Sequence, residues 1–145
     1  MEPKISNPSQ CQILAIDVGS VRMGLALWNP KAQMASLLDH RKRTSLKQDL
    51  KFFRELVQKH EVEVFLIGLP YSLSGNETES TKNALFWVET LKREFSLPVY
   101  TQDESLSSVE AESILKVTHS SHRKQKRDSI SAALFLEEFI RAQKS

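Results

Sequence analysis

The sequence predicts an α/β domain in which one mixed β-sheet is covered by helices. Apolar runs of strand length alternate along the chain with segments whose apolar residues recur at helical spacing. The first three strand-like runs follow one another directly, whereas the later ones are separated by helical segments, and this order favours a mixed sheet. The chain has 145 residues, of which 40% are hydrophobic, which is enough for one domain with one core.

The chain begins with an expected β-hairpin. In ILAIDVGSVRMGLALW, two apolar runs are separated by a short turn at Gly19-Ser20. This arrangement predicts strands at roughly 12–18 and 22–29. A third extended segment is expected in QMASLLDHR, which follows.

The stretch SLKQDLKFFRELVQKH is expected to form the first helix. Its apolar residues recur at helical spacing, at Leu46, Leu50, Phe53 and Val57. Ser45 and Gln48 lie three positions apart at its start, which is the spacing of a capping box.

A buried strand and a second helix are expected next. VEVFLIGLP is almost continuously apolar, as is typical of a strand that is covered on both faces. The second helix is expected from about Thr78, with Asn76 and Glu79 as its cap signals.

The last third of the chain is expected to add one strand and two helices. LPVYTQDE has the pattern of a strand, SSVEAESILK that of a short helix, and DSISAALFLEEFIRAQ that of the final helix. In the final helix Asp128 shares a helical stripe with Phe135, which predicts that Asp128 faces the sheet.

No targeting signal is expected at the N-terminus. Residues 1–10 are polar and lack the apolar stretch of a signal peptide, and the longest aliphatic run, 64–67, is too short to cross a bilayer. We therefore expect a disordered or frayed segment over residues 1–10 and a single domain over residues 11–143. The protein is expected to be cytoplasmic, with no membrane partner.

Cysteine content and net charge exclude some classes of protein. Cys11 is the single cysteine, which excludes an internal disulfide and a thiolate metal cluster. The net charge is only +2. A nucleic-acid partner must therefore be inferred from where the charges lie rather than from their sum.

Acidic residues occur where the expected strands end and where the last helix begins. Asp17 lies inside an apolar strand, where an unpaired carboxylate is costly or takes up a proton. Asp103 and Glu104 end the last strand, and Asp128 begins the last helix. Ligands of open α/β sheets bind beyond the carboxyl ends of strands, so these carboxylates are expected to converge.

A group of carboxylates without cysteine favours a hard cation, Mg²⁺ or Mn²⁺. Such ions polarise a phosphodiester, generate hydroxide from water and stabilise the leaving oxygen. The pattern therefore predicts metal-dependent hydrolysis of phosphodiester bonds. Without metal, the clustered charges are expected to raise one another's pKa, so that either at least one acid is partly protonated or the basic run before Asp128 folds towards the acids.

Each acid also has a purely structural alternative. Asp17 has backbone N–H groups to accept from in the Gly19-Ser20 turn. Asp103 or Glu104 is suited to cap the segment that follows, and Asp128 is suited to complement the dipole of the last helix. Their coincidence at one edge of one sheet favours a shared site.

Basic residues precede the last acid. The stretch KVTHSSHRKQKR contains no acidic residue and leads directly into Asp128. Such runs are most often solvated surface, but a run beside a metal ligand is well placed to hold a phosphate backbone, with an affinity that falls as salt rises. The nucleic-acid-binding candidates in it are Arg123, Lys124, Lys126 and Arg127. A second basic run, HRKR, adds Arg41, Lys42 and Arg43.

Four stretches carry a family resemblance: LAIDVGSVRMGLAL, IGLPYSLSGNETESTKNALFW, LPVYTQDESLSSVEAESIL and KRDSISAALFLEEFI. In this order they resemble the signature blocks of the YqgF family, also called RuvX, a family of Holliday junction resolvase-like and pre-16S rRNA nuclease proteins. One block alone is weakly specific, whereas four in order at suitable spacing are strongly specific.

The resemblance implies an RNase H-like single domain and a nuclease that matures the 5′ end of 16S rRNA in ribosome biogenesis. The family's acidic positions correspond to Asp17, Glu104 and Asp128, as catalytic residues and as metal ligands. This chain departs from the family's usual Asp-Glu-Arg by having Ser105 in place of the arginine. The missing positive charge is then expected from Arg22 or from the later basic run.

Other functions stay open at this point. DVGSVRMG resembles the first phosphate loop of ATPases of the actin and sugar-kinase type. That architecture needs a second lobe, which 145 residues do not supply. A non-catalytic nucleic-acid-binding module would keep the fold without hydrolysis. Among nucleases, precursor 16S rRNA is favoured over branched DNA. A monomer or a homodimer is expected, because a junction presents two symmetric cuts whereas end-trimming needs one site.

Overall fold

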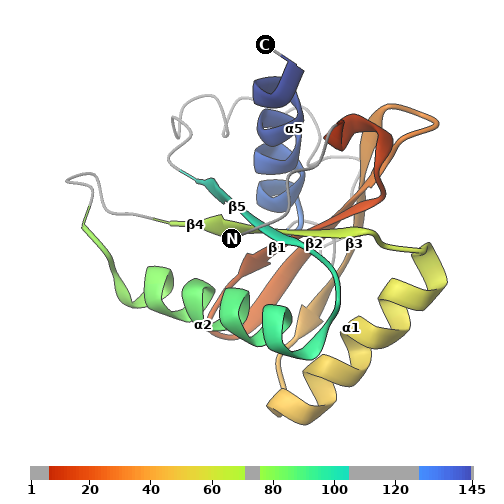
Figure 1. The fold of residues 1–145 in the computed structure, drawn as a ribbon. Helices are drawn as coiled ribbons and strands as arrows, with labels where there is room; N and C mark the ends of the chain where they lie inside the picture. The colour runs from red at the N-terminus through yellow and green to blue at the C-terminus, as the bar shows by residue number, and fades with distance from the viewer. Residues whose placement is uncertain (1–6, 71–75, 105–127, 145) are drawn as a thin grey trace.

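A computed structural model describes residues 7–70, 76–104 and 128–144. Its strands are β1 (Ile13–Val18), β2 (Arg22–Asn29), β3 (Met34–Lys42), β4 (Val64–Leu69) and β5 (Val99–Asp103). Its helices are η1 (Pro8–Gln10), a 3-10 turn, and the α-helices α1 (Leu46–His60), α2 (Glu79–Glu94) and α5 (Ile130–Lys144). The sheet lies between α5 on one side and α1 with α2 on the other (Figure 1).

The strand order is β3-β2-β1-β4-β5, and the predicted mixed sheet is confirmed. β2 pairs antiparallel with both β1 and β3, whereas β4 pairs parallel with both β1 and β5. The helix expected in SSVEAESILK lies outside the described residues. Within the described ranges no helix is both long and apolar enough to span a membrane.

Alternation along the strands divides the apolar residues into two layers. In β1, Leu14 and Ile16 belong to the core beneath α1 and α2, whereas Ile13 and Ala15 belong to the core beneath α5. Successive side chains of a strand point to opposite faces. Asp17 therefore continues the series that faces α5.

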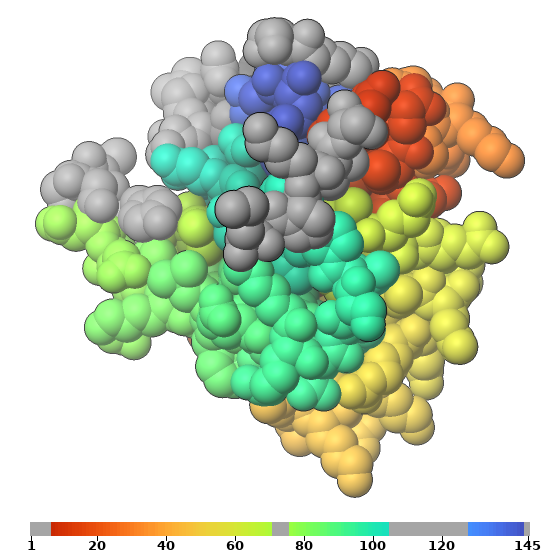
Figure 2. All heavy atoms as spheres, in the orientation of Figure 1, coloured from red at the N-terminus to blue at the C-terminus, as the bar shows by residue number. Residues whose placement is uncertain are grey.

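The layer beneath α1 and α2 is the larger of the two. Phe53 of α1 meets Trp87 of α2 edge to face, with ring centroids 5.6 Å apart. On the other side α5 contributes Phe135, Leu136 and Phe139. In the space-filling view α1 and α2 form a continuous lower layer, and α5 lies above β5 (Figure 2).

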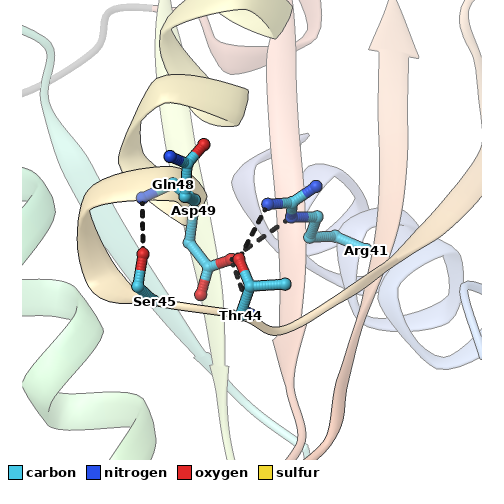
Figure 3. Close-up of polar contacts among 5 residues, drawn as sticks. All are labelled: Arg41, Thr44, Ser45, Gln48 and Asp49. Atoms are coloured by element: carbon cyan, nitrogen blue, oxygen red, sulfur yellow. Dashed lines mark hydrogen bonds and ion pairs between the residues drawn. The ribbon is translucent and has the colours of Figure 1, made fainter.

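The start of α1 is fixed by local polar contacts. The Ser45 hydroxyl accepts a hydrogen bond from the Gln48 N–H at 3.1 Å, which is one half of the predicted capping box (Figure 3). The carboxylate of Asp49, only 2% exposed, accepts from the Thr44 N–H and from Arg41 Nε, each at 3.2 Å. These contacts hold the end of β3 against α1.

The start of α2 differs from the prediction. Thr78 is the N-cap, and it forms a capping box with Thr81, so Asn76 and Glu79 are not the capping pair. The Thr81 hydroxyl also donates to the carbonyl of Pro70. Threonine at both positions supplies hydroxyls that both donate and accept, which a sequence search for an acidic N3 residue overlooks.

The prediction of a frayed N-terminus over residues 1–10 is wrong for residues 7–10. These residues include η1, and Ser9 is only 5% exposed. The Ser9 carbonyl accepts hydrogen bonds from Trp28 Nε1 at 3.0 Å and from Gln33 Nε2 at 2.7 Å. The segment is ordered because it satisfies a buried indole N–H.

Candidate active site

Asp17 and Glu104 meet on the face of the sheet that α5 covers. Asp17 is the last residue but one of β1, and Glu104 follows the last residue of β5, so both lie at the carboxyl edge. Their carboxyl groups share a hydrogen bond, and Glu104 Oε1 is buried without a hydrogen-bond partner. Two carboxyl groups form such a bond only when one of them carries a proton.

The environment favours that proton. Burial, the charge of Asp17, the hydrogen bond with Asp17 and the charge of Asp103 together raise the pKa of Glu104 from 4.5 to about 9. Burial and the charge of Asp128 raise the pKa of Asp17, while the hydrogen bond from Glu104 lowers it. Glu104 is thus the partner expected to hold the proton at neutral pH. Both pKa values move in the direction expected from the sequence, and the protonation of one acid in the absence of metal stays a prediction.

Gly68 makes room for the Glu104 side chain. It follows Ile67, which pairs with Ile16, so Gly68 lies beside Asp17 on the neighbouring strand. A Cβ atom at Gly68 would overlap Glu104 Oε1 and the ring of Phe135. A glycine inside an apolar strand often marks a close approach of this kind.

Gly24 makes room on the other side of Asp17. It is the direct pairing partner of Asp17 on β2. A Cβ atom at Gly24 would overlap the backbone carbonyl oxygen of Asp128. The two glycines therefore let Glu104 and the segment before α5 approach the sheet at the level of Asp17.

A β-bulge opposite Gly24 shapes this approach. Leu25 pairs with Leu38 and Met23 pairs with Arg41, which leaves two residues of β3 opposite one residue of β2. The two residues opposite Gly24 are Asp39 and His40.

Ser129 bridges β2 and β3 beside the bulge. Its hydroxyl accepts from the Leu25 N–H at 2.9 Å and donates to the Leu38 carbonyl at 2.6 Å. The Ser129 side chain is fully buried. These two hydrogen bonds fix the position of the neighbouring residue, Asp128.

The Asp128 carboxylate contacts His40. His40 Nδ1 lies 3.1 Å from Asp128 Oδ2, without the alignment of a hydrogen bond. The Asp128 side chain is 44% exposed, so the prediction that it faces the sheet is wrong for the carboxylate. α5 begins at Ile130, which places Asp128 in the preceding turn, outside the helical stripe: its carbonyl faces the sheet and its side chain turns towards β3.

Asp103 and Glu104 are separated by the alternation of the strand. Asp103 pairs with Leu69, whose side chain lies in the core beneath α1 and α2. Asp103 therefore points away from the face that holds Asp17, and its side chain is exposed. Of the two neighbouring acids, Glu104 is the one that meets Asp17.

The donor set suits a hard cation, but the described side chains do not form a finished metal site. No group of three or more His, Cys, Asp or Glu residues in the described ranges is arranged to hold an ion. Asp17 and Glu104 adjoin, whereas Asp128 acts on Asp17 through its charge and contacts His40. Carboxylate oxygens, including the unpaired buried Oε1 of Glu104, are the ligands that Mg²⁺ and Mn²⁺ prefer.

The basic candidates are only partly described. Arg22 is exposed at the start of β2, at the same edge of the sheet as Asp17. The other predicted phosphate contacts, Arg123, Lys124, Lys126 and Arg127, lie outside the described residues, as does Ser105.

Sequence reasoning missed several residues that build the site. Gly68 carried a usable signal, because it interrupts an apolar strand. His40 and Ser129 carried none, because their roles depend on a bulge that has no clear pattern in the sequence.

Several solved structures that share this fold are Holliday junction resolvases. RuvC of T. thermophilus in complex with a Holliday junction substrate superposes with a TM-score of 0.58 at 18% identity, over 93% of this chain and 98% of that chain. The yeast mitochondrial Holliday junction resolvase Ydc2 gives a TM-score of 0.55 at 14% identity, over 93% of this chain and 80% of the other. The fold is thus that of the RNase H-like resolvases.

A protein-family model assigns the chain to a family, which the shared fold alone does not. The model described as "RuvX: Holliday junction resolvase" matches residues 11–142, and the chain belongs to this family. A relative from Koribacter versatilis is 36% identical over 89% of this chain and 86% of its own length. Another relative, from Lactobacillus johnsonii, is 34% identical over 90% of this chain and 96% of its own length. Both carry the name "Putative pre-16S rRNA nuclease".

Proposed function

We propose that this chain is a metal-dependent nuclease that hydrolyses phosphodiester bonds of precursor 16S rRNA, in the cytoplasm, during maturation of the 5′ end. The observation that carries the proposal is the protonated acidic pair of Asp17 and Glu104 at the carboxyl edge of the sheet, with Asp128 close enough to raise the pKa of Asp17. The names of the relatives support the rRNA substrate.

Mg²⁺ or Mn²⁺ would be held by Asp17, Glu104 and Asp128. When bound, such an ion supplies Lewis-acid polarisation of the phosphodiester and an activated water. Carboxylate ligands must be deprotonated, so Glu104 would have to lose its proton to serve as a ligand. Desolvation of two adjacent acids, which is costly in the metal-free protein, then favours cation binding.

The surrounding residues set the positions of these acids. The Ser129 hydroxyl and the space above Gly24 fix the backbone at Asp128. His40 lies beside the carboxylate of Asp128 and limits where it points. Arg22 and the basic run at residues 123–127 would hold the phosphate backbone of the substrate.

A Holliday junction resolvase is the second candidate, because the family description and the fold both point to that activity. It requires two active sites on one symmetric junction and therefore a homodimer, whereas a monomer suffices for trimming an rRNA end. A non-catalytic nucleic-acid-binding module is the third.

One cleavage assay separates the three. Labelled precursor 16S rRNA and a four-way DNA junction are incubated with the protein under one set of Mn²⁺ and salt conditions, with Asp17→Asn as the control. We expect cleavage of the rRNA by the wild type alone. Cleavage of only the junction would establish the resolvase, and binding without cleavage of either would establish the non-catalytic module.

A further inference from the structure

Two cations lie directly opposite each other at the carboxyl edge of the sheet. Arg22 begins β2, Lys42 ends β3, and the two residues are partners in the antiparallel pairing. Both side chains are exposed. Like charges directly opposite on neighbouring strands destabilise a sheet, so the stability of the fold does not explain this pair.

The neighbouring cations have structural partners. Arg41 forms an ion pair with the buried Asp49 (Figure 3). It also stacks over the Phe52 ring, 4.8 Å from the ring centroid. Arg43 donates from Nη1 to the Gly19 carbonyl at 2.9 Å.

Arg22 and Lys42 are different. Neither has an ion pair or a side-chain hydrogen bond within the described part of the chain. Of the four cations at this edge, two thus anchor the fold, and two have no such partner among residues 7–70, 76–104 and 128–144.

The pair lies on the same face as the acids. Arg22 and Gly24 are two positions apart on β2 and so point to one face, and Gly24 is the direct partner of Asp17. Lys42 shares that face because it pairs with Arg22. At about 3.4 Å per residue, Arg22 lies about 7 Å along the strand from the level of Asp17. A phosphate group near Arg22 is therefore close to one held at the acids.

We propose that Arg22 and Lys42 form a phosphate-binding pair for the stretch of nucleic-acid strand next to the bond that is cleaved. Arginine offers a planar fork of donors that fits phosphate oxygens, and lysine adds a compact charge. A phosphate between them also removes the repulsion of the like charges. That this stretch lies next to the phosphodiester bond that is cleaved rests on the proposed function. The binding of phosphates by Arg22 and Lys42 does not.

The test measures binding without cleavage. A fluorescently labelled single-stranded RNA is titrated in EDTA, at several salt concentrations, with the wild type and with Arg22→Gln/Lys42→Gln. The matched control is Lys47→Gln/Lys51→Gln, which removes the same charge from exposed positions of α1 on the opposite face.

Each lost phosphate contact reduces the slope of log affinity against log salt by about 0.7 for a single strand. The double variant should therefore lose about 1.4 from the slope, and the control should keep the wild-type value. Between about 50 and 200 mM salt, the wild type should lose about sevenfold more affinity than the variant. A Lys42→Arg variant should retain the full slope.

Two outcomes would overturn the proposal: an unchanged slope in the double variant, or an equal loss in the α1 control. Both cations are exposed, so the thermal midpoint of the double variant should match that of the wild type. The cleavage assay is independent of this result. A protein that binds through this pair but cuts nothing would refute the nuclease and leave the phosphate-binding pair standing.

Discussion

The carboxyl groups of Asp17 and Glu104 share one proton at the point where β1 and β5 end. Burial is the main cause of the raised pKa of both residues. Gly68 provides the space that lets Glu104 reach Asp17. In the metal-free protein a proton on Glu104 therefore reduces the charge of the two buried acids, which a cation would offset in the proposed function.

Asp17→Asn should abolish hydrolysis and leave the fold intact. The amide keeps the size of the side chain but removes the negative charge that a cation needs, and it still has an oxygen to accept the hydrogen bond of Glu104. Hydrolysis of precursor 16S rRNA in Mn²⁺ measures the first effect, and circular dichroism measures the second. Wild-type activity in a folded Asp17→Asn protein would sink the assignment of Asp17 as a catalytic residue.

The stability of the metal-free protein should fall as pH rises through the neutral range. Glu104 has a pKa of about 9 in the folded state against an ordinary value of 4.5, so between these values the folded state binds a proton that the unfolded state lacks. Stability contributed by this group is full below pH 4.5 and is lost as pH rises towards about 9. Urea unfolding in EDTA at several pH values measures the trend.

Glu104→Gln is the control for this trend. Glutamine keeps the shape and a donor for Asp17 but does not titrate, so its unfolding free energy should depend less on pH over the same interval. Equal pH dependence in the variant and the wild type would show that another group binds the proton.

β1 and β4 were predictable from the sequence because each is an apolar run with a clear end, whereas β3 and β5 mix polar and apolar residues and were indicated by their place between the other elements. The same feature made Asp17 and Glu104 predictable as neighbours, since both mark carboxyl ends of strands in one sheet. The choice between Asp103 and Glu104 required the register of β5, because a shift of one residue exchanges the two faces.

The surroundings of Asp128 were not predictable in the same way. They depend on a bulge that brings His40 to Asp128 and on the Ser129 hydroxyl, which forms hydrogen bonds with two strands. Both are tertiary contacts without a local sequence preference. The cap of α2 was missed for a related reason. Thr81 serves where a search expects an acidic residue.

Gly68→Ala should impair activity more than a surface change of the same size. The added methyl group would overlap Glu104 Oε1 and the Phe135 ring, so Glu104 must move away from Asp17 or the core beneath α5 must shift. Overpacking of this kind costs about 1–3 kcal/mol of stability. Urea unfolding and rRNA cleavage measure both effects. Unaltered cleavage of rRNA would mean that catalysis does not require Glu104 to lie above Gly68.

Mg²⁺ or Mn²⁺ should raise the thermal midpoint of the wild type. A ligand that binds only the folded state stabilises it by mass action, and the increase should follow the logarithm of the metal concentration once the site is saturated. The shift should shrink in Asp128→Asn, which loses one charged ligand. Thermal unfolding at rising metal concentration provides the measurement. An equal shift in Asp128→Asn and the wild type would remove Asp128 from the metal site.

Ser129→Ala should weaken both the fold and the metal response, although Ser129 itself binds no metal. The substitution leaves the Leu25 N–H and the Leu38 carbonyl without the hydroxyl that pairs them, at a cost of about 1–3 kcal/mol. The turn that carries Asp128 then loses its attachment to the sheet, so the rise in thermal midpoint with Mn²⁺ should be smaller than in the wild type. Ser131→Ala is the matched control, because Ser131 is exposed in the first turn of α5, two residues after Ser129. A lower midpoint with a full Mn²⁺ response in Ser129→Ala would limit Ser129 to stabilising the fold.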